Sequence, residues 1–388
     1  NYNTVVGDEA GTAITTGDVN TFIGYSAGAA TTTGGSNTGI GRLALATNTT
    51  GVNNLAVGVN ALYLLTTGTY NTGIGNSAGA AVTTGVNNTL IGGLAGDAIT
   101  TGDDSVAIGY QALGANTTGG GNIAIGSGAL DANTTAIHNV GVGTNALGGN
   151  TTGTANVALG HRALLTNSTA SNNTAVGYDS LKLNTTGAEN TAVGALAGDA
   201  ITTAPYNTAV GYSALSANTT GDGRNTAIGR AALSATTTGN LNTAVGMNAG
   251  ESVTTGIQNT LIGGLAGDAI TTANNNTAVG MDALSATTTG SSNVAISINA
   301  LGSNTTGGSN IAIGQDSLYA NTTASNNTAV GHNAMVANTT GLYNTASGAY
   351  ALQANTTANS NTAMGYLALA ANTTGHQNTA LGGEAAAS

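Results

Sequence analysis

The sequence predicts an all-β chain, a parallel β-solenoid or β-roll of about 23 coils with 17 residues in each coil. Three observations lead to this prediction: a 17-residue repeat runs along the whole chain, glycine recurs at fixed places in the repeat, and the elements between turns are only four to six residues long. Such elements suit strands, and no segment keeps the i, i+3, i+4 apolar pattern of a helix. Parallel, in-register stacking would let each coil hydrogen-bond to the next.

The repeat is easiest to follow from an asparagine that opens a phrase such as Asn-Thr-Ala-Val-Gly. This asparagine first occurs at Asn3 and recurs every 17 residues up to Asn378, with Ser105 in its place once and with one spacing of 18 between Asn207 and Asn225. The extra residue falls in segment 222–224, where a surface turn would absorb it. With this asparagine as coil position 1, the consensus is N-T-A-(V/I)-G-x-x-A-(L/G)-x-A-(N/I)-T-T-G-x-x.

The repeat predicts a single continuous array over residues 1–388. Asn1 falls at coil position 16, and the last coil stops at position 11 with Ser388. Repeat arrays end in capping repeats when they are complete, and none is evident here. We therefore expect a window of a longer fibre or a subunit of a head-to-tail filament.

The composition differs from that of a compact enzyme. Only 5% of the residues are charged, where about 25% is usual in globular proteins. All charged residues, histidines and tyrosines fall at coil positions 6, 7, 10, 16 and 17 or in the inserted turn, which predicts that these positions face solvent. The net charge of −11 offers no basic patch for nucleic acid. No segment reaches the roughly 20 apolar residues of a membrane helix, and the lack of cysteine suits an extracellular or cell-surface location.

Strand alternation predicts which side chains enter the core. Position 4 is Val, Ile, Leu or Met in every coil except at Ser347, so we expect positions 4 and 2 to point inward and position 3 outward. Position 3 is mostly alanine and is never charged. An outward stripe of this kind would need a partner surface, which predicts a homo-oligomer. The alternative is a two-layer coil in which the chain covers position 3 itself.

Comparing coils with one another also predicts how equivalent positions of neighbouring coils interact. Where position 9 is glycine, position 12 is Ile, Val or Thr, whereas a leucine or methionine at position 9 usually accompanies asparagine at position 12. Because interiors are packed to constant density, we expect positions 9 and 12 to share one space in the core. The asparagine at position 1 should form a ladder in which each side chain bonds to the next coil.

Short phrases resemble a known family of surface proteins. They read SVAIG at Ser105–Gly109, NIAIG at Asn122–Gly126 and NTAIG at Asn225–Gly229. These phrases resemble the head repeats of trimeric autotransporter adhesins, the YadA-like family, and related β-roll repeats occur in phage tail fibres. The resemblance implies a left-handed β-roll, a trimer of side-by-side chains, and a head that binds host, matrix or cell-surface ligands. The coil here is longer than the family repeat, and neither coiled-coil stalk nor membrane barrel is present.

Motifs of catalysis and of metal or cofactor binding have simpler explanations in the repeat. Segments 24–28 and 75–79 match the pattern G-x-S-x-G, but both are ordinary coil turns, and no histidine lies near them in sequence. The glycine pattern at 73–78 likewise arises from the repeat, without a helix to bind phosphate. Three aspartates share position 10 and are interpreted as solvated surface charges; they are Asp97, Asp199 and Asp268. We therefore predict no catalytic, metal or cofactor site, and a non-enzymatic structural or adhesive fibre.

The candidate contact residues are five tyrosines at exposed position 6, which either touch a ligand or are lone surface aromatics. They are Tyr25, Tyr110, Tyr178, Tyr212 and Tyr366. An ice-binding solenoid is an alternative function, although the adjacent threonines Thr117 and Thr118 should point to opposite faces and leave one exposed rank at most. A phage-type tail fibre is another. The sequon at Asn116 is interpreted as a turn and ladder element in preference to a glycosylation site.

Overall fold

The computed structural model describes residues 2–387, which contain 23 parallel strands stacked as a β-solenoid and no helix. This confirms the predicted fold class and the coil of 17 residues. Each strand spans positions 2–4 of its coil. The strands are β1 Thr4–Val6, β2 Thr21–Ile23, β3 Thr38–Ile40, β4 Leu55–Val57, β5 Thr72–Ile74, β6 Thr89–Ile91, β7 Val106–Ile108, β8 Ile123–Ile125, β9 Val140–Val142, β10 Val157–Leu159, β11 Thr174–Val176, β12 Thr191–Val193, β13 Thr208–Val210, β14 Thr226–Ile228, β15 Thr243–Val245, β16 Thr260–Ile262, β17 Thr277–Val279, β18 Val294–Ile296, β19 Ile311–Ile313, β20 Thr328–Val330, β21 Thr345–Ser347, β22 Thr362–Met364 and β23 Thr379–Leu381.

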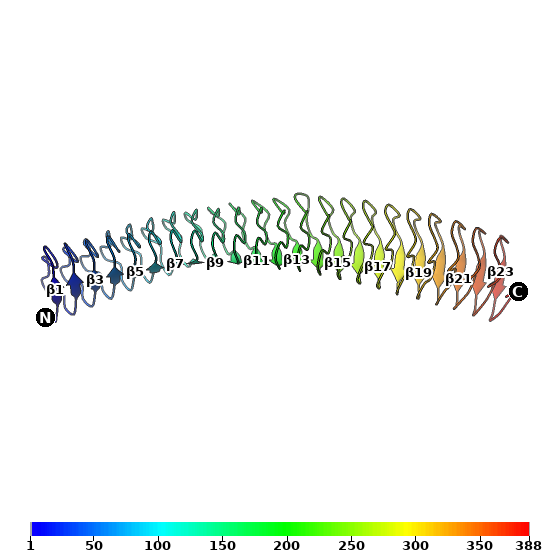
Figure 1. Cartoon of the computed structure of the whole chain (residues 1–388), viewed down its shortest axis with the longest axis horizontal. Helices are drawn as coiled ribbons and strands as arrows, with labels where there is room; N and C mark the ends of the chain where they lie inside the picture. The colour runs from blue at the N-terminus through cyan, green and yellow to red at the C-terminus, as the bar shows by residue number, and fades with distance from the viewer. Residues whose placement is uncertain (1, 388) are drawn as a thin grey trace. The chain divides into compact units, whose positions relative to one another are not determined.

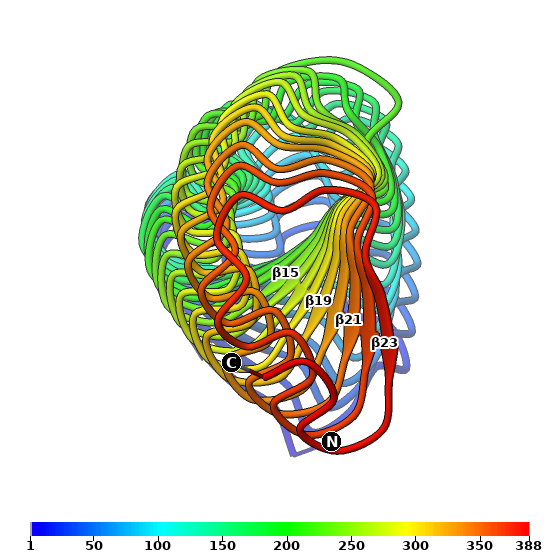
Figure 2. The same cartoon turned by 90° about the vertical axis from the view of Figure 1, so that its right-hand side faces the viewer.

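The chain divides into two units, Asn1–Asn190 with strands β1 to β11 and Thr191–Ser388 with strands β12 to β23. Both units are built in the same way (Figure 1). Within each unit, a strand pairs in register with the strand one coil away, so that Thr38 lies beside Leu55 and Thr243 beside Thr260. In the C-terminal unit, the strands labelled in Figure 2 lie on one side of the coil, each rotated slightly from the one before, as the twist of parallel strands requires.

Hydrogen bonds between coils continue well beyond the three strand residues. The Gly24 N–H donates to the Val6 carbonyl at 2.8 Å, and the Gly28 N–H donates to the Ala44 carbonyl at 2.9 Å. The same pattern recurs along the chain at coil positions 7, 11, 13 and 17. The turns therefore take part in the stack, which satisfies backbone groups that a loop would otherwise leave to water.

The direction of the strand side chains is opposite to the prediction. Position 3 points inward: Ala56, Ala227 and Ala346 are each 0% exposed. Positions 2 and 4 point outward, as at Ile40 and Ile228, which are both 38% exposed. The expected alternation holds, but its phase is shifted by one residue, and such a shift exchanges the two faces of a strand. The physical reason is the narrow coil, whose interior beside the strand has room for alanine in most coils and for a larger side chain only where another position is small.

Each coil contains four positions with positive φ. Position 5 is the most demanding, because Gly75 has a φ of 135° and a Cβ on this residue would lie 2.5 Å from the Gly92 oxygen. The sequence predicts this bend. Positions 7, 9 and 17 also adopt the left-handed region and carry ordinary side chains there, including Leu62 with a φ of 49°. Such a conformation costs about 1–2 kcal/mol per residue, and at position 9 the buried side chain offsets it.

Positions 9 and 12 do share one space, as predicted, and position 3 shares it with them. A Cβ on Gly96 would lie 2.8 Å from Ile99 Cδ1 and equally close to Leu90 Cδ2. The sharing extends across coils, because a Cβ on Gly79 would lie 2.6 Å from Leu90 Cδ1 in the next coil and 2.8 Å from Leu62 Cδ2 in the previous one. The packing unit is therefore three positions over neighbouring coils, one more position than the sequence comparison revealed.

Two asparagine ladders run inside the coils. At position 1, the buried Asn37 amide donates to Asn20 Oδ1 at 3.2 Å and to the Gly51 carbonyl at 2.9 Å, which confirms the predicted ladder. At position 12 a second ladder exists that was not predicted, in which Asn150 Nδ2 donates to Asn133 Oδ1 at 3.1 Å. The second ladder depends on asparagine at position 12 in most coils, but a threonine can also take part, because Asn304 Nδ2 donates to the Thr287 hydroxyl at 3.2 Å.

Candidate interaction surfaces

One surface that recurs in every coil is formed by positions 2 and 4 of the strands, and we call it the strand face. Position 2 carries Thr, Val, Ile or Leu, and position 4 carries an aliphatic side chain except at Ser347. Side chains at position 4 that lie away from the stack ends are more than one-third exposed in many coils, as at Ile125 with 36% and Ile262 with 39%. No charged side chain occurs on this face in either unit. The uncharged stripe that the sequence assigned to position 3 therefore exists, but on the neighbouring positions.

A second surface, the turn edge, consists of positions 6, 7 and 10. All five candidate tyrosines lie here, with exposed fractions between 46% for Tyr25 and 55% for Tyr110. They do not gather at one site, because they belong to separate coils. Only two of them take part in ring contacts that extend along the turn edge, namely Tyr178 and Tyr366.

Tyr178 belongs to a charged cluster between coils ten and eleven. Its ring stacks on His161 with centroids 5.5 Å apart, and its hydroxyl accepts a hydrogen bond from Arg162 at 2.9 Å. Arg162 also makes a two-pronged contact with Asp179, with distances of 2.8 and 2.7 Å, and the Lys182 amine lies 3.3 Å from the same carboxylate. The hydrogen bond to Asp179 raises the pKa of the Arg162 guanidinium. The Asp179 side chain is only 6% exposed, so this cluster joins two coils and leaves little free charge.

Tyr366 belongs to a group of three rings in consecutive coils. The rings of His332 and Tyr350 meet edge to face with centroids 5.3 Å apart, and those of Tyr350 and Tyr366 do so at 6.2 Å. The sequence reasoning missed His332 and Tyr350, because it considered only tyrosines at position 6. The signal was available, since these three residues occupy position 6 or 7 of adjacent coils and follow one another at intervals of 18 and 16 residues.

The aspartates at position 10 are less solvated than predicted. Asp97 and Asp268 are only partly exposed, and burial raises the pKa of both carboxyl groups. The pKa of Asp131, which shares this column with Asp97, is raised for the same reason. Their interpretation as freely solvated charges is therefore wrong for Asp97 and Asp268. The carboxyl groups lose part of their solvent because position 10 lies beside the buried positions 9 and 12.

The polar side chains of the G-x-S-x-G segments and of the sequon make hydrogen bonds within the fold. The hydroxyl of Ser26 donates to Glu9 Oε2 at 2.8 Å, and that of Ser77 donates to Asn76 Oδ1 at 3.3 Å. Asn116 is 0% exposed and its amide donates to the Gly119 carbonyl at 2.8 Å. Its place in the ladder leaves no room for a glycan on the folded coil.

The two threonines of the turn point in different directions, as predicted. The half-buried Thr117 hydroxyl donates to the Thr134 carbonyl of the next coil at 3.1 Å, whereas Thr118 is exposed. Position 14 is an exposed threonine in every coil that reaches it. This gives one exposed rank of threonines on the turn side, in addition to the threonines at position 2 of the strand face.

Within residues 2–387, no three His, Asp or Glu side chains lie close enough together to bind a metal ion. The same residues include no helix of the length and apolar character needed to cross a bilayer.

Comparisons with known proteins add no family assignment. No protein-family model matches the chain, and no curated protein matches its sequence. The resemblance to YadA-like head repeats therefore stays a prediction, as do the left-handed winding and the three-chain assembly that it implies.

Proposed function

We propose that this chain is a non-enzymatic, extracellular structural or adhesive fibre whose copies associate through the strand face. The observation that carries the proposal is the uncharged surface of positions 2 and 4, which continues through β1 to β11 in one unit and through β12 to β23 in the other. A water-exposed surface that excludes charge over so many repeats is typical of an interface.

The size of this face suits self-association. Strands about 4.8 Å apart make the face of each unit on the order of 50 Å long, and with a width of roughly 10 Å each unit offers about 500 Å². Two copies of one unit would therefore bury about 1,000 Å² in total, which is about the lower limit for a specific interface. Because the face carries threonine and aliphatic ranks of the same spacing on every copy, a symmetric assembly of identical chains can match rank to rank. A trimer is the assembly that the family resemblance favours, and a head-to-tail filament is the alternative.

Introducing positive charge into the strand face tests this proposal. Ile91 and Ile262 occupy equivalent places on the strand face, one in each unit, within the shared phrase NTLIGGLAGDAITT. Sedimentation velocity should find the wild-type chain as an oligomer, and the Ile91→Lys/Ile262→Lys variant should dissociate, because an unpaired buried ammonium is costly. A matched variant on the turn edge, Tyr110→Lys, should keep the wild-type state. A monomeric wild-type chain at micromolar concentration contradicts the proposal.

Ice binding is the second candidate, and one observation favours it. Threonine at position 2 and a β-branched side chain at position 4 share one outward face two residues apart, as at Thr243 and Val245. Regular ranks of threonine hydroxyls and methyl groups on a flat sheet can order water in a lattice. If this is the function, the wild-type chain inhibits ice recrystallisation while monomeric, and Ile91→Lys/Ile262→Lys weakens the inhibition. An oligomer without effect on ice excludes this candidate.

A further inference from the structure

The aromatic patch of the C-terminal unit, defined as His332, Tyr350 and Tyr366, is the one place on the turn edge in residues 2–387 where rings of three consecutive coils are linked by contacts, with Tyr350 touching each of the other two. His332 is exposed, Tyr366 is 53% exposed, and Tyr350 lies half-buried between them. Their edge-to-face contacts at 5.3 and 6.2 Å fix the rings in place, so a ligand would meet a preformed surface. The patch runs along the stack, from one coil to the next.

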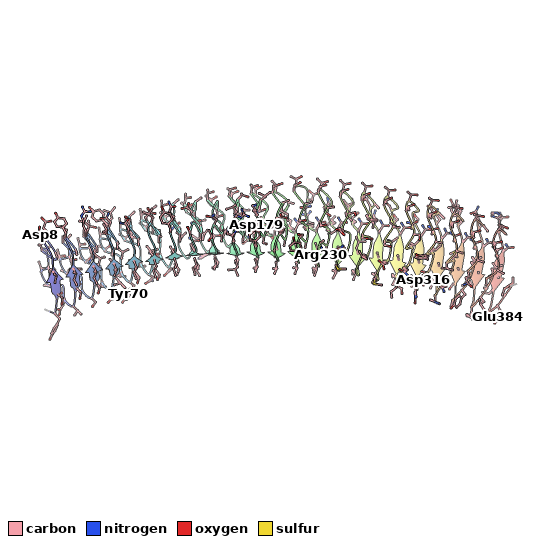
Figure 3. All side chains as sticks on the ribbon, viewed as in Figure 1. Asp8, Tyr70, Asp179, Arg230, Asp316 and Glu384 are labelled. Carbon is pink, nitrogen blue, oxygen red and sulfur yellow. The ribbon has the colours of Figure 1, made fainter. Side chains whose placement is uncertain are left out.

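Amide and carboxylate side chains lie on the same stretch of the turn edge. The Asn333 amide lies 3.1 Å from His332 Nε2, and Gln315 donates to Asp316 at 3.2 Å. Asp316 and Glu384, labelled in Figure 3, occupy position 7 at the two ends of this stretch of the turn edge. Amide and carboxylate groups can donate to and accept from hydroxyl groups in the same site.

The charge distribution restricts the ligand further. The last basic residue of the chain is Arg230, so residues 231–388 contain no Lys or Arg. An anionic ligand would therefore meet acidic groups such as Asp316 without a compensating cation. This excludes phosphorylated or sulfated partners and favours a neutral ligand.

We propose that the aromatic patch binds a neutral, linear polysaccharide that lies along the stack. The flat C–H face of a pyranose ring packs on an aromatic face, and its hydroxyl groups bond to amides and carboxylates at the rim. Coils follow one another at about 4.8 Å, and an extended β-1,4-linked chain advances by nearly the same distance for each sugar ring. The inference deepens the adhesive part of the proposed function, because it names a ligand class for the fibre.

A proline-rich peptide is the other partner that aromatic surfaces recognise. Such a peptide docks into grooves between rings that stand apart. In the aromatic patch the rings touch one another, with Tyr350 filling the space between His332 and Tyr366. These contacts leave no gap between neighbouring rings for a polyproline helix, whereas the exposed ring of Tyr366 can offer a face to a sugar ring.

Titration of the full-length chain with cellohexaose and chitohexaose, followed by tyrosine fluorescence and saturation-transfer NMR, tests the inference. The wild-type chain should bind one or both oligosaccharides, and Tyr366→Ala should weaken binding about tenfold or more. Tyr366→Phe keeps the ring and should bind within a few-fold of wild type. The matched control is Tyr212→Ala, which removes an equally exposed tyrosine at position 6 (54%) and should leave binding unchanged.

Several results would overturn the inference: no binding of either oligosaccharide, equal binding by wild type and Tyr366→Ala, or binding of poly-L-proline in their place. Circular dichroism of each variant separates loss of the site from loss of the fold. Sedimentation tests only the association through the strand face. A wild-type chain that is oligomeric but binds no sugar would therefore refute this inference and leave the proposed association intact.

Discussion

Replacing Leu90 with alanine should remove the side chain that fills the core of two coils at once. Leu90 is 0% exposed. A Cβ on Gly79 would lie 2.6 Å from its Cδ1, and a Cβ on Gly96 would lie 2.8 Å from its Cδ2. Both glycines therefore depend on this one leucine for their packing, and neither has a side chain that could move into the cavity.

The expected loss follows from the size of this cavity. Leu→Ala substitutions in cores cost about 2–5 kcal/mol, with the larger values where the site cannot collapse. We expect the upper half of this range for Leu90→Ala. Converting the same coil to the consensus with Gly96→Leu and Ile99→Asn should recover at least about half of the loss, because Leu113 and Asn116 occupy these positions in the next coil. The new leucine would adopt the left-handed φ that Leu113 tolerates at 54°, at a cost of about 1–2 kcal/mol.

Thermal unfolding followed by circular dichroism, together with hydrogen exchange of residues 88–104, measures both effects. Local exchange is needed because long repeat arrays do not unfold in two states. Leu261→Ala is the matched variant and should lose a similar amount of stability, since Leu261 lies in the identical phrase and packs on Gly250 and Gly267 in the same way. A Leu90→Ala variant within about 0.5 kcal/mol of wild type, or a triple variant no more stable than the single one, refutes the three-position packing rule.

Three further predictions concern single columns of the coil. Ser297→Gly should stabilise the chain by about 1 kcal/mol in denaturant titration, because Ser297 holds a φ of 106° at a position that otherwise carries glycine; a destabilised variant would show that the serine is needed there. Asn150→Ala should cost at least about 2 kcal/mol, since it leaves ladder partners unpaired, whereas Asn48→Ala should cost less because Asn48 Oδ1 already has no partner; equal losses in thermal melts would count against the ladder. Burial raises the pKa of Asp268 in the folded chain, so its stabilising contribution is complete below the unfolded pKa and is lost as pH rises through the folded pKa. Asp268→Asn should therefore raise the melting temperature at pH 7 but not at pH 3, and a rise at both pH values would exclude titration as the cause.

The repeat made the fold predictable, because each coil contacts mainly its neighbours and one 17-residue period describes all of them. The same comparison between coils predicted the shared space of positions 9 and 12 and the ladder that includes Asn37. It did not reveal the role of position 3, because only four coils carry a side chain larger than alanine there, among them those of Phe22 and Leu90. The aromatic patch was missed for a related reason: its residues alternate between positions 6 and 7, so it does not follow a single column.

The sequence by itself determined the period, the register and the alternation of the strands, since these are properties of a linear pattern. Only the tertiary structure decided which half of that alternation faces inward. Both halves are apolar or small, so hydrophobicity alone does not separate them, and the choice depends on the width of the closed coil. That width admits Ala227 and excludes Ile228 from the interior, and the aliphatic side chains excluded in this way form the strand face on which the proposed association depends.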